Sequence, residues 1–320
     1  VIGGKRIPPG RSRDVRLKVS ETYYGDPISI HLRVIRAKEP GPVVFVSAAI
    51  HGDELNGTGI IHEWIARKSL KLKRGTLILV PVVNIMGFEA NERYLPDRRD
   101  LNRCFPGSAT GSMAGRLAHT LMTEVVAHCD YGIDLHTAAI QRTNFPNIRG
   151  DLKNKGVSRL AEAFGCELLV NGKGPDGSFR REATKCGCPT ITVEAGETWK
   201  IERAIRDFGV SGVWNVLIEL GMMDGDLYVP SFQAKIFKTQ WVRAELGGIL
   251  RFHVVPGQPV AKGEAIASNF SIMGRQQSTL ESPLKGIILG MTTMPTVKPG
   301  EPVCHIAQTS RSLASIRRAI

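Results

Sequence analysis

The sequence predicts an α/β fold, with a mixed sheet between helices, followed by a smaller all-β region. Residues 43–50 and 76–83 form nearly continuous apolar runs, which indicate strands that are buried on both faces and covered by helices. After Gly225 the composition changes to short, glycine-rich strands. We therefore divide the chain into a domain of residues 1–225, a small β domain of residues 226–308 and a basic tail of residues 309–320.

The first elements follow from the spacing of apolar residues. Alternating apolar positions in residues 15–19 and 28–34 predict two antiparallel strands, joined by a turn near Gly25, at an edge of the sheet. The apolar run that ends at Ile50 is the next strand, and helical spacing then continues to about Lys68.

A long stretch without clear periodicity, residues 84–111, comes next. A loop of this length inside a compact domain is usually functional or disordered, and apolar side chains such as Leu95 and Leu101 argue against disorder. Its four arginines are consistent with a binding loop or with a solvated charged face.

Helices and strands alternate through the rest of the first domain. The pattern predicts helices at residues 112–128, 157–164 and 202–220, and strands at residues 131–136, 167–170 and 190–194. Two connecting stretches are expected to be loops: the polar residues 141–147, which are placed to line the site, and a glycine-rich segment that carries Arg180 and Arg181.

Composition limits the classes of partner. The chain has 320 residues, 42% of them hydrophobic and 22% charged, which is typical of a globular protein. Its net charge of +12 indicates anionic partners, but the basic residues are dispersed and follow no nucleic-acid-binding motif, so we favour a small acidic substrate over nucleic acid. Since no apolar run is long enough to cross a bilayer and the first residues lack a signal-type core, we expect no membrane partner and a cytoplasmic location.

Polar side chains follow two of the predicted strands. His51 and Glu54 stand three residues apart where a strand pattern gives way to a helix, and His136 ends another strand. Imidazole nitrogen and carboxylate oxygen both bind zinc, and a catalytic zinc takes three protein ligands. Asp134 lies two residues before His136 on the same strand face, where it can orient the imidazole.

These residues, together with Asp100-Leu101-Asn102-Arg103 and Glu194-Ala195-Gly196, resemble the succinylglutamate desuccinylase/aspartoacylase family. The resemblance covers roughly the first two thirds of the chain, with the motifs in the family order. It implies a zinc-carboxypeptidase-like fold and one Zn²⁺ per chain.

The resemblance also implies individual roles. Glu194 falls at the position of the family's general base, with Glu197 a weaker rival, and Asn102 and Arg103 at positions that hold a substrate carboxylate. Arg93 matches the arginine that polarises the scissile carbonyl, with Arg99 as the alternative and also as a candidate for substrate binding. Either Arg180 or Arg181 is expected to be a second anion contact, and Arg181 is our candidate for substrate binding.

The predicted function is zinc-dependent hydrolysis of the amide bond in a small anionic N-acyl amino acid. Two alternatives stay open: a metallocarboxypeptidase acting on peptide C-termini, and a non-catalytic binding protein. Retention of His51, Glu54, His136 and Glu194 argues against the latter. Neither charge nor repeats decide whether the chain forms a homo-oligomer.

The C-terminal region contains two similar halves. Residues 247–267 and 286–307 each show a strand, a Pro-Gly turn and a strand, which resembles a barrel-sandwich hybrid of the biotinyl/lipoyl type. Carrier domains of that type present a modified lysine on the hairpin between the halves, but residues 269–277 contain no lysine. We therefore expect a scaffold or a lid over the active site, followed by a basic tail that is disordered or packed on a partner subunit.

Overall fold

The computed structural model describes residues 1–67 and 70–317, which are organised around one large sheet. Ten of its strands lie side by side in this order: β1 (Ser12–Glu21), β2 (Pro27–Arg36), β4 (Arg74–Val80), β3 (Glu39–Ala48), β5 (Tyr131–His136), β8 (Thr190–Gly196), β6 (Arg142–Gly150), β15 (Gly286–Thr292), β17 (Pro302–Gln308) and β10 (Thr239–Arg243). Three short strands attach to its side: β12 (Pro259–Val260) to β15, β7 (Leu168–Asn171) to β6, and β9 (Ala234–Ile236) to β7.

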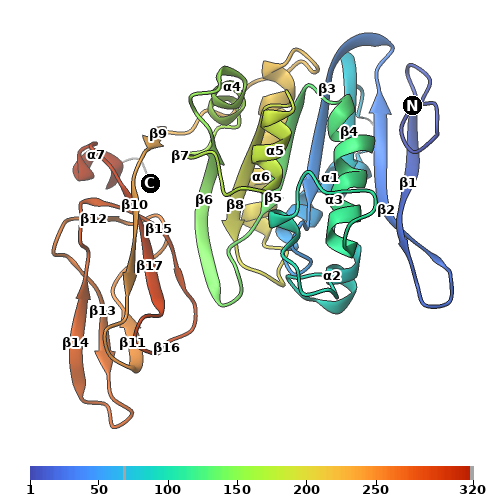
Figure 1. Cartoon of the computed structure of the whole chain (residues 1–320). Helices are drawn as coiled ribbons and strands as arrows, with labels where there is room; N and C mark the ends of the chain where they lie inside the picture. The colour runs from blue at the N-terminus through green and yellow to red at the C-terminus, as the bar shows by residue number, and fades with distance from the viewer. Residues whose placement is uncertain (68–69, 318–320) are drawn as a thin grey trace.

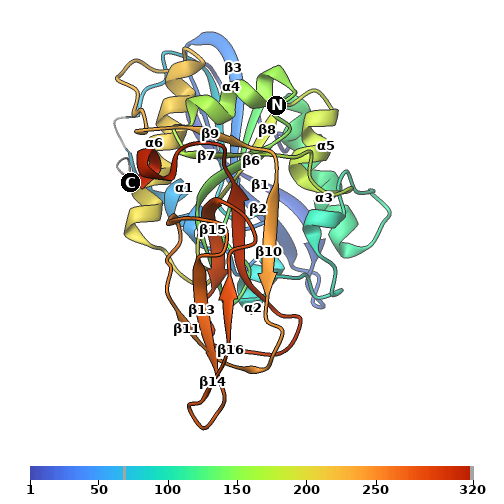
Figure 2. The ribbon, with the colours of Figure 1, turned by 90° about the vertical axis from the view of Figure 1, so that its left-hand side faces the viewer.

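A second sheet holds the other C-terminal strands. Its order is β14 (Gln276–Glu281), β13 (Ala265–Phe270), β11 (Gly248–Phe252) and β16 (Thr296–Val297). Figure 1 shows the N-terminal strands at one end of the large sheet and the C-terminal strands beyond β6 at the other, and in Figure 2 this second sheet extends away from helices α4, α5 and α6.

The helices belong mainly to the first two thirds of the chain. They are α1 (Asn56–Ala66), α2 (Ile85–Ala90), α3 (Met113–Glu124), α4 (Lys155–Ala163), α5 (Phe179–Lys185), α6 (Arg203–Glu219) and α7 (Leu313–Arg317), with 3₁₀ turns η1 (Leu101–Arg103) and η2 (Val126–His128). In the part of the chain that the structure describes, no helix has the length and apolar character that crossing a bilayer requires.

Two apolar cores lie on opposite faces of the large sheet. Val44 and Val46 of β3 belong to the core under α1, α4 and α6, whereas Phe45 between them belongs to the core under α3 and α5. Successive strand residues point to opposite faces, so a continuous apolar run is what a strand with two covered faces requires. The mixed sheet between helices is therefore confirmed.

Most of the predicted elements are present. The N-terminal strands pair antiparallel as β1 and β2, with β1 at the sheet edge. Helix α3 begins after Ser112, whose hydroxyl accepts the N–H of Gly115, and α4 begins after Asn154, which caps Val157 in the same way. The predicted end of α1 at Lys68 lies outside the described residues.

Three expectations were wrong. Residues 85–90 of the supposed loop form α2, residues 142–150 form strand β6, and Arg180 and Arg181 lie in helix α5. Helices α2 and α5 have only six and seven residues, too short to show a clear period. In β6 the polar side chains of Arg142 and Asn144 line a cavity, so the strand lacks the usual apolar alternation.

The C-terminal strands extend the large sheet as well as forming the second one. Strand β15 pairs antiparallel with β6, so that Gly290 lies opposite Asn144 and Thr292 opposite Arg142. The residues between the two sheets, among them Leu250, Ile266 and Val303, form a core of their own. Of the predicted tail, residues 313–317 form α7 and residues 318–320 lie outside the described part.

Candidate active site

The site lies where three parallel strands end together. The register of β3, β5 and β8 aligns Ala48 with Leu135 and His136 with Glu194. The carboxyl ends of these strands therefore present side chains to one place. This edge of an α/β sheet is where ligands of such folds usually bind.

The turn after β3 carries two side chains of the site, His51 and Glu54. Ala49 adopts the left-handed conformation at φ 51°, and the N–H of Glu54 donates to the carbonyl of His51 at 3.2 Å. At the start of α1, Asn56 exchanges hydrogen bonds with Glu202, donating at 2.9 Å and accepting from its N–H at 2.7 Å. This pair fixes the turn against the segment that follows β8.

Three buried side chains converge here. The Nδ1 atoms of His51 and His136 lie 2.7 and 2.8 Å from the two oxygens of Glu54. The backbone N–H of Thr137 also donates to Glu54, at 3.0 Å. One ligand atom from each of His51, Glu54 and His136 lies within 4.8 Å of the others.

Carboxylates hold the outer nitrogens of both imidazoles. Nε2 of His136 lies 2.7 Å from Asp134, which in turn accepts the hydroxyl of Ser47 at 2.8 Å. Nε2 of His51 lies 3.1 Å from Asp100. The predicted orienting role of Asp134 thus has the expected geometry. Asp100 was named only as part of a motif, and its contact with His51 was not predicted.

Charge outweighs burial in this cluster. Burial alone would favour the neutral form of every group. The imidazoles nevertheless hold the pKa of Glu54 well below its ordinary value, and Asp134 and Glu54 raise the pKa of His136 well above its own. The pKa of Asp100 is likewise lowered against the effect of burial, by His51 and Arg93.

The donor set fits a zinc ion. Two imidazoles and one carboxylate are the ligands of several catalytic zinc sites, which leave one coordination position for water or substrate. Here both Nδ1 atoms face the same buried carboxylate, and the outer nitrogens have carboxylate partners of the kind that orient zinc-bound histidines. His51, Glu54 and His136 are therefore suited to hold a metal ion, as predicted.

Glu194 faces the cluster from the neighbouring strand. It is half-buried, accepts a hydrogen bond from the amide of Asn144 at 3.1 Å, and lies 3.9 Å from Nε of Arg149. Glu197 instead pairs with Lys200 at 2.8 Å. Of these two glutamates, Glu194 is the one that lines the cavity.

Arg93 of the loop lies beside the cluster. Arg93 donates to Glu54 and to Asp100, each at 3.2 Å, and both carboxylates raise its pKa against the effect of burial. Asn102 accepts the backbone N–H of Phe179 at 2.8 Å, which joins this loop to α5. Arg93, Asn102 and Arg103 all line the cavity.

Two predicted substrate contacts lie elsewhere. Arg99 is exposed and lies 3.8 Å from Asp97, and Arg181 pairs with Asp176. Neither is among the residues that line the cavity, whereas Arg180 is. Neighbouring residues of a helix point in different directions, so sequence alone could not choose between Arg180 and Arg181.

The cavity has a volume of about 260 Å³ and is strongly basic. Its charged lining combines the carboxylates Glu54 and Glu194 with five arginines: Arg93, Arg103, Arg142, Arg149 and Arg180. Arg142 and Arg149 come from β6, and Trp241 comes from β10 of the C-terminal region. Arg142 belongs to the stretch 141–147 that was expected to line the site, whereas Arg149 and Trp241 were not predicted. Trp241 is close because β10 joins the large sheet through β17.

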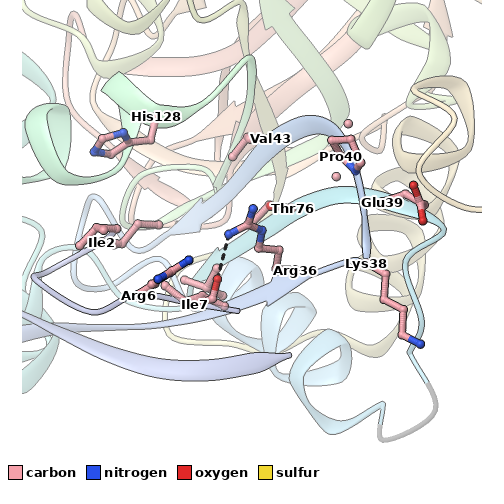
Figure 3. A pocket seen from close by; sticks show the side chains of 14 residues that line it. Ile2, Arg6, Ile7, Arg36, Lys38, Glu39, Pro40, Val43, Thr76 and His128 are labelled. Atoms are coloured by element: carbon pink, nitrogen blue, oxygen red, sulfur yellow. Dashed lines mark hydrogen bonds between the residues drawn. The ribbon is translucent and has the colours of Figure 1, made fainter. Parts of the chain in front are cut away.

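A separate cavity of about 310 Å³ lies beside the N-terminal segment (Figure 3). Its lining includes Arg6, Arg36, Lys38 and His128, with Glu39 as the acidic member. Arg36 donates to the carbonyl of Ile7 at 2.9 Å. Since this cavity contains no histidine–carboxylate cluster, the strand-end cavity is the candidate active site.

An α/β sheet with such a cluster at its strand ends is characteristic of a class of hydrolases. The family model of the succinylglutamate desuccinylase/aspartoacylase catalytic domain matches residues 40–220. The match covers more than half of the chain, which therefore belongs to this family.

Individual relatives agree with this assignment. The N-alpha-acetyl-L-2,4-diaminobutyric acid deacetylase of Halomonas elongata is 24% identical over 301 residues, covering 89% of this chain and 87% of its own. The product-bound structure of the ectoine utilization protein EutE (DoeB) from Ruegeria pomeroyi has a TM-score of 0.83 and 23% identity, covering 95% of this chain and 98% of that one. A succinylglutamate desuccinylase/aspartoacylase from Rhodobacter sphaeroides has a TM-score of 0.82 and 22% identity, covering 94% and 95%.

Proposed function

We propose that this protein is a zinc-dependent deacylase that hydrolyses the amide bond of a small anionic N-acyl amino acid. The observation that carries the proposal is the single cavity shared by the His51–Glu54–His136 cluster, Glu194 and five arginines. The name of the Halomonas relative, an N-acetyl amino acid deacetylase, supports the same reaction class.

His51, Glu54 and His136 would hold the zinc ion, which when bound polarises a carbonyl and makes water more acidic. Glu194 takes the proton from the attacking water and passes it to the leaving nitrogen, so that amide and water become carboxylate and amine. Asn144 and Arg149 position Glu194 for this transfer.

Different arginines bind different negatively charged groups of the substrate. Arg93 uses two of its five N–H donors on Glu54 and Asp100, and the others remain for the oxyanion that develops on the scissile carbonyl. A preorganised donor of this kind typically lowers a barrier by about 3 kcal/mol. Arg103, the amide nitrogen of Asn102 and Arg180 would bind the substrate carboxylate.

The C-terminal region favours a small substrate over a peptide end. Trp241 of β10 forms part of the cavity wall and stacks on His305, with ring centroids 4.4 Å apart. We propose that residues 226–308 act as a barrel-sandwich-type scaffold that closes this side of the site, and that the enzyme works in the cytoplasm. A metallocarboxypeptidase would need an open path for the rest of a peptide.

The test is amine release from N-acetyl, N-succinyl and N-formyl amino acids and from dipeptides, each with and without a strong chelator. We expect chelator-sensitive release from one acyl amino acid, restored by zinc. Release from dipeptides alone would favour the carboxypeptidase. A zinc-loaded protein that turns over none of these compounds would refute the proposal.

A further inference from the structure

A second basic cavity lies behind one wall of the active site. It has a volume of about 310 Å³, and we call it the rear cavity. Its lining consists of Asp151, Asn154, Lys173, Arg180, Arg181, Thr184, Lys185 and Thr190. Four of these side chains are cationic and one is a carboxylate, so the rear cavity favours an anion.

Two of the four cations lack a strong partner of their own. Arg181 pairs with Asp176, and Lys185 lies 3.6 Å from Glu182. Lys173 is exposed and makes no ion pair within residues 1–67 and 70–317. Arg180 likewise has no carboxylate within ion-pair distance in this described part of the chain.

Arg180 is the more unusual of the two. Its Nε is buried without a hydrogen-bond partner, and its Nη2 has only a long contact of 3.5 Å with the carbonyl of Gly172. Burial and the nearby Arg149 lower its pKa to about 10. A partly buried guanidinium without a close partner is unfavourable, so an anion beside it would restore a favourable interaction.

Arg180 lines both cavities. Arg180 lines the active-site cavity together with Glu194, and it lines the rear cavity together with Lys173. The glycine-rich loop permits this placement: a Cβ on Gly174 would lie 3.1 Å from Cζ and Nη2 of Arg180. The residue that carries this positive charge is therefore part of the wall of each cavity.

The cavity beside the N-terminal segment is a useful contrast. It also contains several basic side chains, but Arg36 is engaged with the carbonyl of Ile7 (Figure 3). Among the described residues, its lining has no buried nitrogen without a hydrogen-bond partner. The rear cavity is thus the stronger candidate for a built anion site.

We propose that the rear cavity binds a small multivalent oxyanion through Lys173 and Arg180, and that its occupancy weakens the binding of an anionic substrate in the active site. Both anions draw on the charge of Arg180 and repel each other across it. The coupling is reciprocal, so substrate also weakens oxyanion binding. The effect on turnover rests on the proposed deacylase function, whereas oxyanion binding itself does not.

The binding test uses the full chain and isothermal titration with inorganic phosphate, with succinate as a second arm. We expect saturable binding of one anion per chain. Lys173→Ala should weaken it about tenfold, the effect of one lost charge-assisted hydrogen bond. Lys153→Ala removes a nearby exposed lysine that does not line the rear cavity and should change the affinity little.

Binding of only one anion assigns the site to that oxyanion class. Failure of both anions to bind, or binding that Lys173→Ala leaves unchanged, overturns the proposal. Because titration needs no substrate, it tests whether the rear cavity binds an oxyanion even if every deacylase assay fails.

The kinetic test measures KM and kcat at increasing phosphate and constant ionic strength. Phosphate in the rear cavity should raise KM to a plateau and leave kcat unchanged, and Lys173→Ala should remove this effect without altering basal activity. A rise in KM without a plateau, equal in wild type and Lys173→Ala, would place the phosphate in the active site and overturn the proposal.

Discussion

Two glutamates near the end of β8 differ in their surroundings. Glu194 lines the active-site cavity beside Asn144, whereas Glu197 is held by Lys200. Gly196 lies between the two glutamates and adopts the left-handed conformation at φ 73°, so Glu194 and Glu197 leave the backbone in different directions. These surroundings support our proposal that Glu194, rather than Glu197, carries the proton.

Replacing Glu194 by Gln should leave the metal site intact and lower kcat by about 10²–10⁴-fold, the usual contribution of a general acid–base group. The proposed ligands His51, Glu54 and His136 are untouched, so metal content should equal that of the wild type. Glu197→Gln is the matched control and should stay near wild-type activity. A comparable loss of kcat in both variants would contradict the assignment of the proton-transfer role to Glu194 alone.

His305 gives the C-terminal region a defined dependence on pH. It is 9% exposed, stacks on Trp241, and burial together with Arg149 lowers its pKa to about 4. The unfolded chain, with an imidazole pKa of about 6.5, takes up this proton first as the pH falls. His305 therefore favours unfolding progressively between about pH 6.5 and pH 4.

Substituting His305 by Phe keeps an aromatic ring against Trp241 and removes the titration. From pH 7 to pH 4, the unfolding free energy of the wild type should fall by about 3 kcal/mol more than that of His305→Phe. Denaturant unfolding at several pH values measures this difference. A difference that does not change with pH would show that His305 is not buried in its neutral form.

The turn between β3 and α1 depends on one close backbone approach. A Cβ on Gly52 would lie 2.1 Å from the carbonyl carbon of Gly87 and 2.2 Å from the nitrogen of Phe88, both in α2. Since His51 and Glu54 flank this position, the close approach of α2 constrains the backbone beside two of the candidate metal ligands.

Gly52→Ala should destabilise the fold by about 1–3 kcal/mol, because backbone on both sides has to move. The shift should also displace His51 and Glu54 and lower zinc affinity. Thermal unfolding and metal titration measure the two effects. Gly247→Ala is the control, since its nearest neighbour would lie at 3.6 Å, an ordinary contact. Normal zinc affinity in Gly52→Ala would show that contact with α2 does not determine the geometry of the metal site.

Sequence predicts elements well where burial and period agree. Strand β3, with two covered faces, and α3, with a cap at Ser112, follow directly from their patterns. The candidate metal ligands are predictable for a related reason: each lies next to a recognisable strand end. By contrast, β6 lacks the apolar alternation of a typical strand, because polar residues such as Arg142 and Asn144 point into the cavity.

At the scale of the whole molecule, the site is completed by residues distant in sequence. Trp241 reaches the cavity because β10, β17 and β15 continue the large sheet beyond β6. Pairing between β6 and β15 joins segments separated by more than a hundred residues, which local patterns cannot reveal. The arginines on β6 are likewise placed by this pairing rather than by a motif.

The same pairing argues that both parts of the chain unfold together. One core cluster contains Leu168 of β7, Ile236 of β9 and Leu289 of β15, so apolar packing crosses the predicted boundary at residue 225. Removing residues 226–320 would expose this core and leave an edge of β6 unpaired. We therefore expect one calorimetric transition for the full chain, with equal calorimetric and van't Hoff enthalpies, and aggregation of an isolated fragment 1–225. Two separate transitions, with a folded and soluble fragment, would instead show that residues 1–225 form an autonomous domain and that the C-terminal strands serve only to close the site.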